Sequence, residues 1–169
     1  IAHCIDSLLA RNPALDGAEV DDVVVGAARQ IGEQSANVAR YGVALSKLPI
    51  SVSAATISRA CSSGLNAIAI AATQIMSGCA EVAMAGGVES ITGLDRGTPA
   101  KFDEHPRLMA DMPAIFMPMG NTAEVVARRY NVTREQQDAY ALQSQQRYAA
   151  AVAAGYIADE IAPMTVDWL

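Results

Sequence analysis

The order of apolar and polar residues predicts short strands alternating with helices in the first half of the chain. Apolar residues at helical spacing predict a helix from Ile1 to about Arg11, which Pro13 ends. Apolar runs at 23–26 and 52–57 predict buried strands, separated by a loop at 29–34 and an amphipathic helix at 36–48. A helix from Asn66 to about Ser77 and a strand at 81–85 follow. This alternation predicts an α/β fold, with a mostly parallel sheet and helices on both faces.

The second half of the chain is predicted to be mainly helical. The segment from 92 to 118 holds four of the seven prolines and is predicted to be irregular, as functional or flexible loops are. Asn121 or Thr122 can cap a helix that runs to about residue 130. Thr133 and Gln136 form a capping box for a long helix that reaches 154. Residues 160–166 predict a final strand, which Pro163 would place at a sheet edge.

Composition bounds the possible functions. The chain has 169 residues, 51% of them hydrophobic, which is enough for one domain with a real core. The net charge is −6 and there is no basic run, which argues against nucleic-acid binding. Three cysteines without a C-x-x-C pair predict free thiols in a reducing compartment. No apolar run is long enough to span a membrane, no signal peptide is visible, and no metal site is expected.

The candidate chemistry centres on Cys61, in the stretch Ser-Arg-Ala-Cys-Ser-Ser-Gly-Leu-Asn-Ala. A strand leads into this stretch and a helix leads out, so Cys61 lies at a sharp turn. A helix N-terminus favours a thiolate, and Gly64 lets the backbone approach closely. A lone cysteine can also be a small buried apolar residue, so both interpretations stay open at this point.

A cysteine nucleophile needs a base, most often a histidine within hydrogen-bond reach. The chain has two histidines. His3 falls in the first predicted helix, and His105 falls in the irregular segment. Neither is a convincing base, so the residues alone predict a nucleophile without its partner.

Four segments resemble motifs of the thiolases, in that family's order and spacing, and the resemblance covers the chain from Ile1 to about Val166. The segments are Arg-Ala-Cys-Ser-Ser-Gly-Leu-Asn-Ala at 59–67, Ala-Met-Ala-Gly-Gly-Val-Glu-Ser at 83–90, Met-Gly-Asn-Thr-Ala-Glu at 119–124 and Thr-Arg-Glu-Gln-Gln-Asp-Ala-Tyr-Ala at 133–141. The resemblance implies a five-stranded, mostly parallel sheet whose first strand would precede Ile1. Residues 1–169 would form most of an N-terminal thiolase domain, with 92–118 as a covering loop on the coenzyme A side.

The resemblance also implies residue roles. Cys61 would be the nucleophile that carries the acyl group, and Met119 and Gly120 would help to bind the substrate or coenzyme A. Independently of the resemblance, Gly64, Gly86, Gly87 and Glu89 are expected to support the site. A tight turn and close approach to a ligand remain equally open for the Gly86–Gly87 pair, and Glu89 is expected to be a buried, hydrogen-bonded structural anchor more than a general base. The base would be the histidine of a Gly-His-Pro motif, and a second cysteine would lie in a Cys-x-Gly-Gly-Gly motif. Both belong to the C-terminal thiolase half and are absent from this sequence.

The reaction implied is thiolytic cleavage of a 3-ketoacyl-CoA, because residues 93–99 and 117–120 look most like the degradative 3-ketoacyl-CoA thiolases. Coenzyme A would be a substrate, with no permanently bound cofactor. The alternatives are a biosynthetic acetoacetyl-CoA thiolase, a 3-ketoacyl synthase and an inactive half-domain that serves as an interaction or CoA-binding subunit. The expected assembly is a homodimer or tetramer, with the C-terminal half needed in cis or in trans, so this chain alone is expected to be inactive. The expected compartment is the bacterial cytoplasm, or the peroxisome or mitochondrial matrix of a eukaryote.

Overall fold

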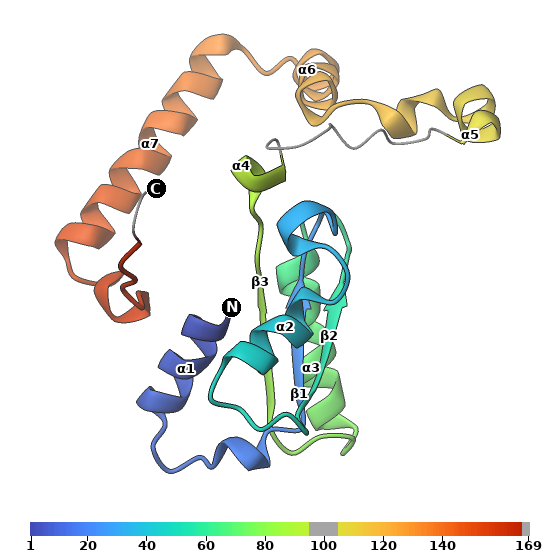
Figure 1. The fold of residues 1–169 in the computed structure, drawn as a ribbon. Coiled ribbons are helices and arrows are strands. Elements are labelled where there is room, and N and C mark those ends of the chain that lie inside the picture. The colour runs from blue at the N-terminus through green and yellow to red at the C-terminus, as the bar shows by residue number, and fades with distance from the viewer. Residues whose placement is uncertain (95–104, 167–169) are drawn as a thin grey trace. The chain divides into compact units, whose positions relative to one another are not determined.

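The computed structural model describes residues 1–94 and 105–166 (Figure 1). The chain divides into two compact units, the first made of Ile1–Ala100 with Ala162–Leu169 and the second of Lys101–Ile161. The elements of the first unit are α1 (Ala2–Arg11), β1 (Asp22–Gly26), α2 (Val38–Leu45), β2 (Ser53–Ile57), α3 (Ser63–Met76), β3 (Ala83–Gly87) and α4 (Ile91–Leu94), with 3-10 turns at Gly17–Glu19 and Gly32–Gln34.

The first unit is built on a parallel sheet, which confirms the predicted fold class. Within the described residues the sheet has three strands in the order β2-β1-β3. Gly26 pairs with both Ile57 and Gly87, so all three strands end at one level. We call this end the carboxyl edge of the sheet. The opposite end, where Asp22 pairs with Ser53 and Ala83, is the amino edge.

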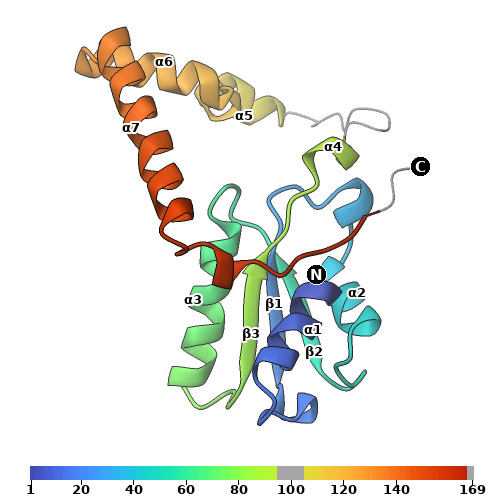
Figure 2. The same ribbon diagram turned by 90° about the vertical axis from the view of Figure 1, so that its left-hand side faces the viewer.

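Helices cover both faces of the sheet, with α3 on one side and α1 and α2 on the other (Figure 2). Val23 and Val25 belong to a buried cluster with apolar residues of α1 and α2, such as Ile5 and Val43. Side chains alternate along a strand, so Val24 points to the other face, where α3 packs against β1 and β3. The apolar run at 23–25 is therefore buried on both sides, as in parallel sheets generally.

Several predicted boundaries are wrong. The helix that follows Cys61 begins at Ser63 and not at Asn66, and β3 extends through Gly87 and not only to 85. The final strand predicted at 160–166 does not form: residues 161–166 have no regular structure and pair with no strand in the described part of the chain. A strand needs a neighbour for its backbone groups, and Pro163 also lacks an N–H to donate.

The second unit is helical. Its elements are α5 (Pro106–Asp111), a 3-10 turn (Pro113–Phe116), α6 (Met119–Tyr130), α7 (Arg134–Ala153) and a 3-10 turn (Ala158–Glu160). The segment predicted to be irregular thus contains short helices, while residues 95–104 of it lie outside the described residues. The predicted capping box is confirmed, since the Thr133 hydroxyl accepts the N–H of Gln136 at 3.3 Å. The expected cap at Asn121 or Thr122 is wrong, because α6 begins at Met119.

None of the helices in the described ranges combines the length and the apolar character that crossing a bilayer requires.

Candidate active site

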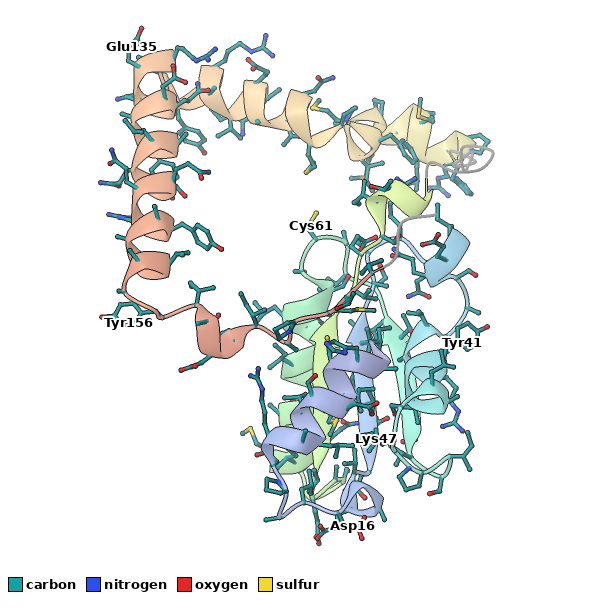
Figure 3. The ribbon with its side chains drawn as sticks, turned by 60° about the vertical axis from the view of Figure 1, so that its left-hand side comes forward. Asp16, Tyr41, Lys47, Cys61, Glu135 and Tyr156 are labelled. Carbon is teal, nitrogen blue, oxygen red and sulfur yellow. The ribbon has the colours of Figure 1, made fainter. Side chains whose placement is uncertain are left out.

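Cys61 lies in the loop between β2 and α3, at the carboxyl edge of the sheet (Figure 3). The buried hydroxyl of Ser63 closes this loop. Its Oγ accepts the N–H of Arg59 at 2.8 Å and donates to the carbonyl of Ala60 at 2.5 Å. The N–H of Ser62 bonds back to the carbonyl of Arg59 at 3.2 Å. Cys61 is therefore exposed at the tip of a closed turn, directly before the N-terminus of α3.

The residue before the cysteine has a left-handed backbone. Ala60 has a φ of 45°, a conformation that costs a residue with a Cβ roughly 1–2 kcal/mol. Strain of this kind persists only where the surrounding structure fixes it, and it is common at functional sites. Alanine carries no turn signal, so the sequence pattern does not predict this feature.

Three glycines bring the ends of β1 and β3 against the first turn of α3. A Cβ placed on Gly26 would lie 2.2 Å from the carbonyl carbon of Ser63. A Cβ on Gly87 would lie 3.1 Å from the Cα of Gly64. A side chain at Gly26 would therefore push the start of α3, and with it the Cys61 turn, away from the sheet. The glycine at 26 closes a run of buried valines, which is the signal in the sequence that could have revealed this close approach.

A hydrogen-bond network joins the loop after β1 to the turn after β3. The carboxylate of Glu89 accepts the N–H groups of Ala28 at 2.8 Å and Arg29 at 3.3 Å, and the side-chain amide of Gln34. Gln34 is only 2% exposed. Its amide also donates to the carbonyl of Arg29 and accepts the N–H of Ser90 at 2.7 Å. One buried amide and one carboxylate thus fix both loops.

The charge of Glu89 is stabilised by these contacts. Burial raises the pKa of Glu89, but the hydrogen bonds from Ala28, Gln34 and Arg29, with the positive charge of Arg29, outweigh it and leave the pKa below its ordinary value of 4.5. The group is therefore a carboxylate at neutral pH and only accepts hydrogen bonds. In this state Glu89 anchors two loops and has no proton to donate.

The carboxyl edge carries a cavity of about 620 Å³, a size within the range of small-molecule sites. Open α/β sheets characteristically bind ligands at this edge. The cavity is lined by glycines, other small residues and charged side chains of both signs. The lining residues are Gly26, Ala28, Arg29, Ala60, Cys61, Ser63, Gly64, Gly87, Val88, Glu89 and Ile91.

The cavity brings together four of the residues singled out in the sequence, namely Cys61, Gly64, Gly87 and Glu89. The fifth, Gly86, lines a separate groove between β3 and α1.

Two predicted residues lie elsewhere. Met119 and Gly120 form the start of α6 in the second unit, so their role in binding stays a prediction. Of the two candidate bases, His3 donates a hydrogen bond from Nε2 to the carbonyl of Ala162, at 3.3 Å. His105 precedes α5 in the second unit. Among the described residues, no histidine lines the cavity around Cys61.

The sequence pattern predicts the segment at 29–34 only as a loop and indicates no role for Arg29 or Gln34. Arg29 lines the cavity, and Gln34 is the centre of the network that holds it. A glutamine in a polar loop looks solvated, and nothing in the pattern indicates its burial.

The arrangement suits covalent chemistry at a carbonyl carbon. The N-terminus of α3 lies beside Cys61, and the positive end of the helix dipole can stabilise negative charge that develops on a reacting group there. The open cavity gives a substrate access to the sulfur.

Comparison with known proteins assigns this chain to a family. The thiolase N-terminal domain matches residues 1–168, so the chain belongs to the thiolase family. It is 41% identical to a 3-ketoacyl-CoA thiolase of Serratia proteamaculans, over 97% of this chain and 42% of that protein. It is also 41% identical to a beta-ketoadipyl-CoA thiolase of Acinetobacter baylyi, over 96% of this chain and 44% of that protein.

A solved structure agrees with this assignment. The crystal structure of the Bacillus anthracis acetyl-CoA acetyltransferase superposes with a TM-score of 0.81 at 32% sequence identity, covering 99% of this chain and 45% of that one. The chain thus spans less than half the length of the curated relatives it matches.

Proposed function

We propose that this chain is the nucleophile-bearing part of an acyltransferase that cleaves 3-ketoacyl-CoA by thiolysis. The Cys61 sulfur attacks the keto carbon, and the bond between that carbon and its α-carbon breaks. The electron pair and a proton go to the departing α-carbon, which leaves as acetyl-CoA, while the acyl group stays on Cys61 as a thioester. The thiol of a free coenzyme A then takes up the acyl group and returns the proton.

The observation that carries the proposal is the position of Cys61. It lies exposed on a closed turn, at the start of α3 and in the lining of a cavity of about 620 Å³. The names of the relatives support the acyl-CoA substrate class, and the thiolase family supports the acyl-cysteine chemistry. The protons that the reaction moves would be handled by the C-terminal half, which the family resemblance implies in cis or in trans.

The test is to supply the chain with its C-terminal half, in cis or in trans, mix this complete enzyme with a 3-ketoacyl-CoA, quench the mixture in acid and map the adduct by peptide mass spectrometry. We expect an acyl group on Cys61 and none on Cys4 or Cys79, both of which are also exposed. The Cys61→Ser variant should carry no adduct. A folded protein without any adduct would instead favour the alternative of an inactive half-domain that binds a partner or coenzyme A.

Two other acyl-CoA substrates belong in the same experiment. The Bacillus anthracis relative is an acetyl-CoA acetyltransferase, which favours the biosynthetic direction as a second candidate. With acetyl-CoA alone, that candidate predicts acetylation of Cys61 and formation of acetoacetyl-CoA. Beta-ketoadipyl-CoA as the substrate tests whether this protein accepts the compound in the name of its Acinetobacter relative. A 3-ketoacyl synthase would fail to cleave a 3-ketoacyl-CoA with coenzyme A.

The outer face of α3 supports the proposed assembly with a thiolase C-terminal half and further copies. Four large apolar side chains of this helix are exposed. They are Leu65, Ile68, Ile75 and Met76, with exposed fractions of 72%, 52%, 46% and 87%. A patch of this kind marks an interaction surface more often than a free one.

A further inference from the structure

The Cys61 turn is tied to the network around Glu89 through the backbone of one residue, Ala28. The hydroxyl of Ser58 donates a hydrogen bond to the carbonyl of Ala28 at 3.1 Å. The N–H of the same Ala28 donates to Glu89 at 2.8 Å. Ser58 directly follows β2 and precedes Cys61 by three residues. We call the group of Ser58, Ala28, Glu89 and Gln34 the Ala28 strap.

The Ala28 strap lies directly beyond the last hydrogen bonds between the strands of the sheet. The last bonds between the three strands are those from the N–H of Ala27 to the carbonyl of Ile57, at 3.0 Å, and from the N–H of Val88 to the carbonyl of Gly26, at 2.9 Å. Beyond them three loops leave the carboxyl edge. The strap links all three, because Glu89 follows β3, Ala28 follows β1 and Ser58 follows β2.

We propose that Ser58 and Glu89 are positioning residues for Cys61, with Gln34 orienting the Glu89 carboxylate. The proposal rests on the role of Cys61 as nucleophile. Ala28 and Glu89 line the same cavity as Cys61, so the strap fixes the cysteine turn relative to the wall that a substrate would touch. Covalent catalysis depends strongly on such placement, since a misplacement of about 1 Å can cost roughly a hundredfold in rate.

The amino edge of the sheet offers a matched control made of the same chemical groups. There the hydroxyl of Ser53 donates to the carbonyl of Asp21 at 2.8 Å and, in addition, to the carboxylate of Asp22 at 3.0 Å. The carboxylate of Asp21 accepts two consecutive N–H groups before β3, those of Glu81 at 2.7 Å and Val82 at 3.2 Å. Ser53→Ala and Asp21→Asn therefore remove the same kinds of bond as Ser58→Ala and Glu89→Gln, at the edge without Cys61.

The first measurement is hydrogen exchange of the folded chain. In Ser58→Ala and Glu89→Gln we expect exchange in the 59–63 segment to accelerate by about threefold to tenfold, the effect of one lost hydrogen bond. Exchange at 81–82 should stay unchanged in these variants, while Ser53→Ala and Asp21→Asn should show the reverse pattern. Ser58→Thr keeps the hydroxyl and should restore the wild-type rate. Equal acceleration at both edges in all four variants would overturn the proposal, because it would mean a loss of global stability only.

The second measurement is the rate at which Cys61 acquires an acyl group from a 3-ketoacyl-CoA in the complete enzyme, where the C-terminal half is present. The rate should fall about tenfold in Ser58→Ala and Glu89→Gln and return in Ser58→Thr, with Ser53→Ala and Asp21→Asn like the wild type. An equal fall in the Ser53 and Asp21 variants would contradict a positioning role. If even the wild type forms no adduct, the proposed function fails, and the exchange experiment alone decides whether the strap holds the turn.

Discussion

At both edges of the parallel sheet, a carboxylate accepts two consecutive backbone N–H groups and a serine hydroxyl donates to a backbone carbonyl. Asp21 and Ser53 do this at the amino edge, and Glu89 and Ser58 do it at the carboxyl edge. The two sets are so alike in chemistry that their side chains alone would not distinguish a structural clamp from a functional one.

The backbone around the two sets is what differs. At the carboxyl edge, Gly26 and Gly87 let α3 approach the sheet with its N-terminus, and a strained Ala60 turns Cys61 outwards beside a cavity. At the amino edge, α3 ends at Met76, and Gly78 supplies the left-handed turn with a φ of 74°. The comparison teaches that helix polarity and strand direction, and not the clamps, decide which edge can carry the chemistry.

The largest difference in activity is expected between variants of the two exposed cysteines that flank α3. Cys61→Ala removes the proposed nucleophile at the N-terminal end of the helix, so acyl transfer in the complete enzyme should fall by at least about 10³-fold. Cys79→Ala, beyond the C-terminal end, should leave it unchanged. Steady-state thiolysis assays compare the two variants. Comparable losses in both would refute the assignment of the reaction to the carboxyl edge.

The next largest effect concerns two glycines, one at each edge. In Gly26→Ala the new Cβ would overlap the backbone of Ser63, and we expect a loss of about 3 kcal/mol or more in the free energy of unfolding. In Gly78→Ala nothing lies within 4 Å of the new Cβ, so only the left-handed backbone is penalised, by about 1 kcal/mol. Urea unfolding curves measure both values. A Gly26→Ala protein as stable as Gly78→Ala would show that α3 is not held against the sheet at this point.

The two carboxylates also predict how stability depends on pH. Hydrogen bonds from Glu81 and Val82 hold the pKa of Asp21 below its ordinary value of 3.8, against a smaller effect of burial. The pKa of Glu89 is likewise below 4.5, because its hydrogen bonds outweigh its burial. A lowered pKa in the folded state gives stability that is fully present above the ordinary value and is lost as the pH falls through the folded value.

Stability should therefore be constant above about pH 5 and decrease below about pH 4.5, because the carboxylates take up protons in the unfolded state before they do so in the folded state. Urea midpoints measured across this range should fall less steeply for Asp21→Asn and for Glu89→Gln than for the wild type. A slope that stays the same in both variants would mean that other groups cause the acid sensitivity.

The sequence pattern predicts the first two strands and the helices of the first unit because their apolar periodicity reflects burial directly. The pattern fails where the close packing of one backbone segment against another determines the structure. The pair Gly86 and Gly87 resembles a turn, yet it completes β3, and a Cβ on Gly87 would lie only 3.1 Å from the Cα of Gly64. The start of α3 is also missed: the helix begins at Ser63, three residues before the predicted Asn66, with Gly64 in its first turn.

The candidate site likewise contains residues that the sequence predicts and residues that it does not. Cys61 could be predicted because a cysteine at a strand-to-helix turn has a chemical reason to be there. Gln34 could not, because its partners are the backbone of Arg29 and Ser90 and the side chain of Glu89, the last two more than 50 residues away in the chain. Contacts of this kind leave no local pattern. The strand expected at 160–166 failed for the complementary reason, since a strand exists only with a neighbour.

The smallest effect, with opposite signs at the two edges, is expected for alanine-to-glycine changes. Ala60→Gly relieves the left-handed strain of roughly 1–2 kcal/mol but adds chain entropy to the unfolded state, so a net gain of about 0.5 kcal/mol is expected. Ala18→Gly, in an exposed turn before β1, brings only the entropy and should lose about 0.5 kcal/mol. Urea midpoints give both signs. A loss in Ala60→Gly as large as that in Ala18→Gly would show that the turn before Cys61 stores no strain, and that the two edges do not differ in this respect.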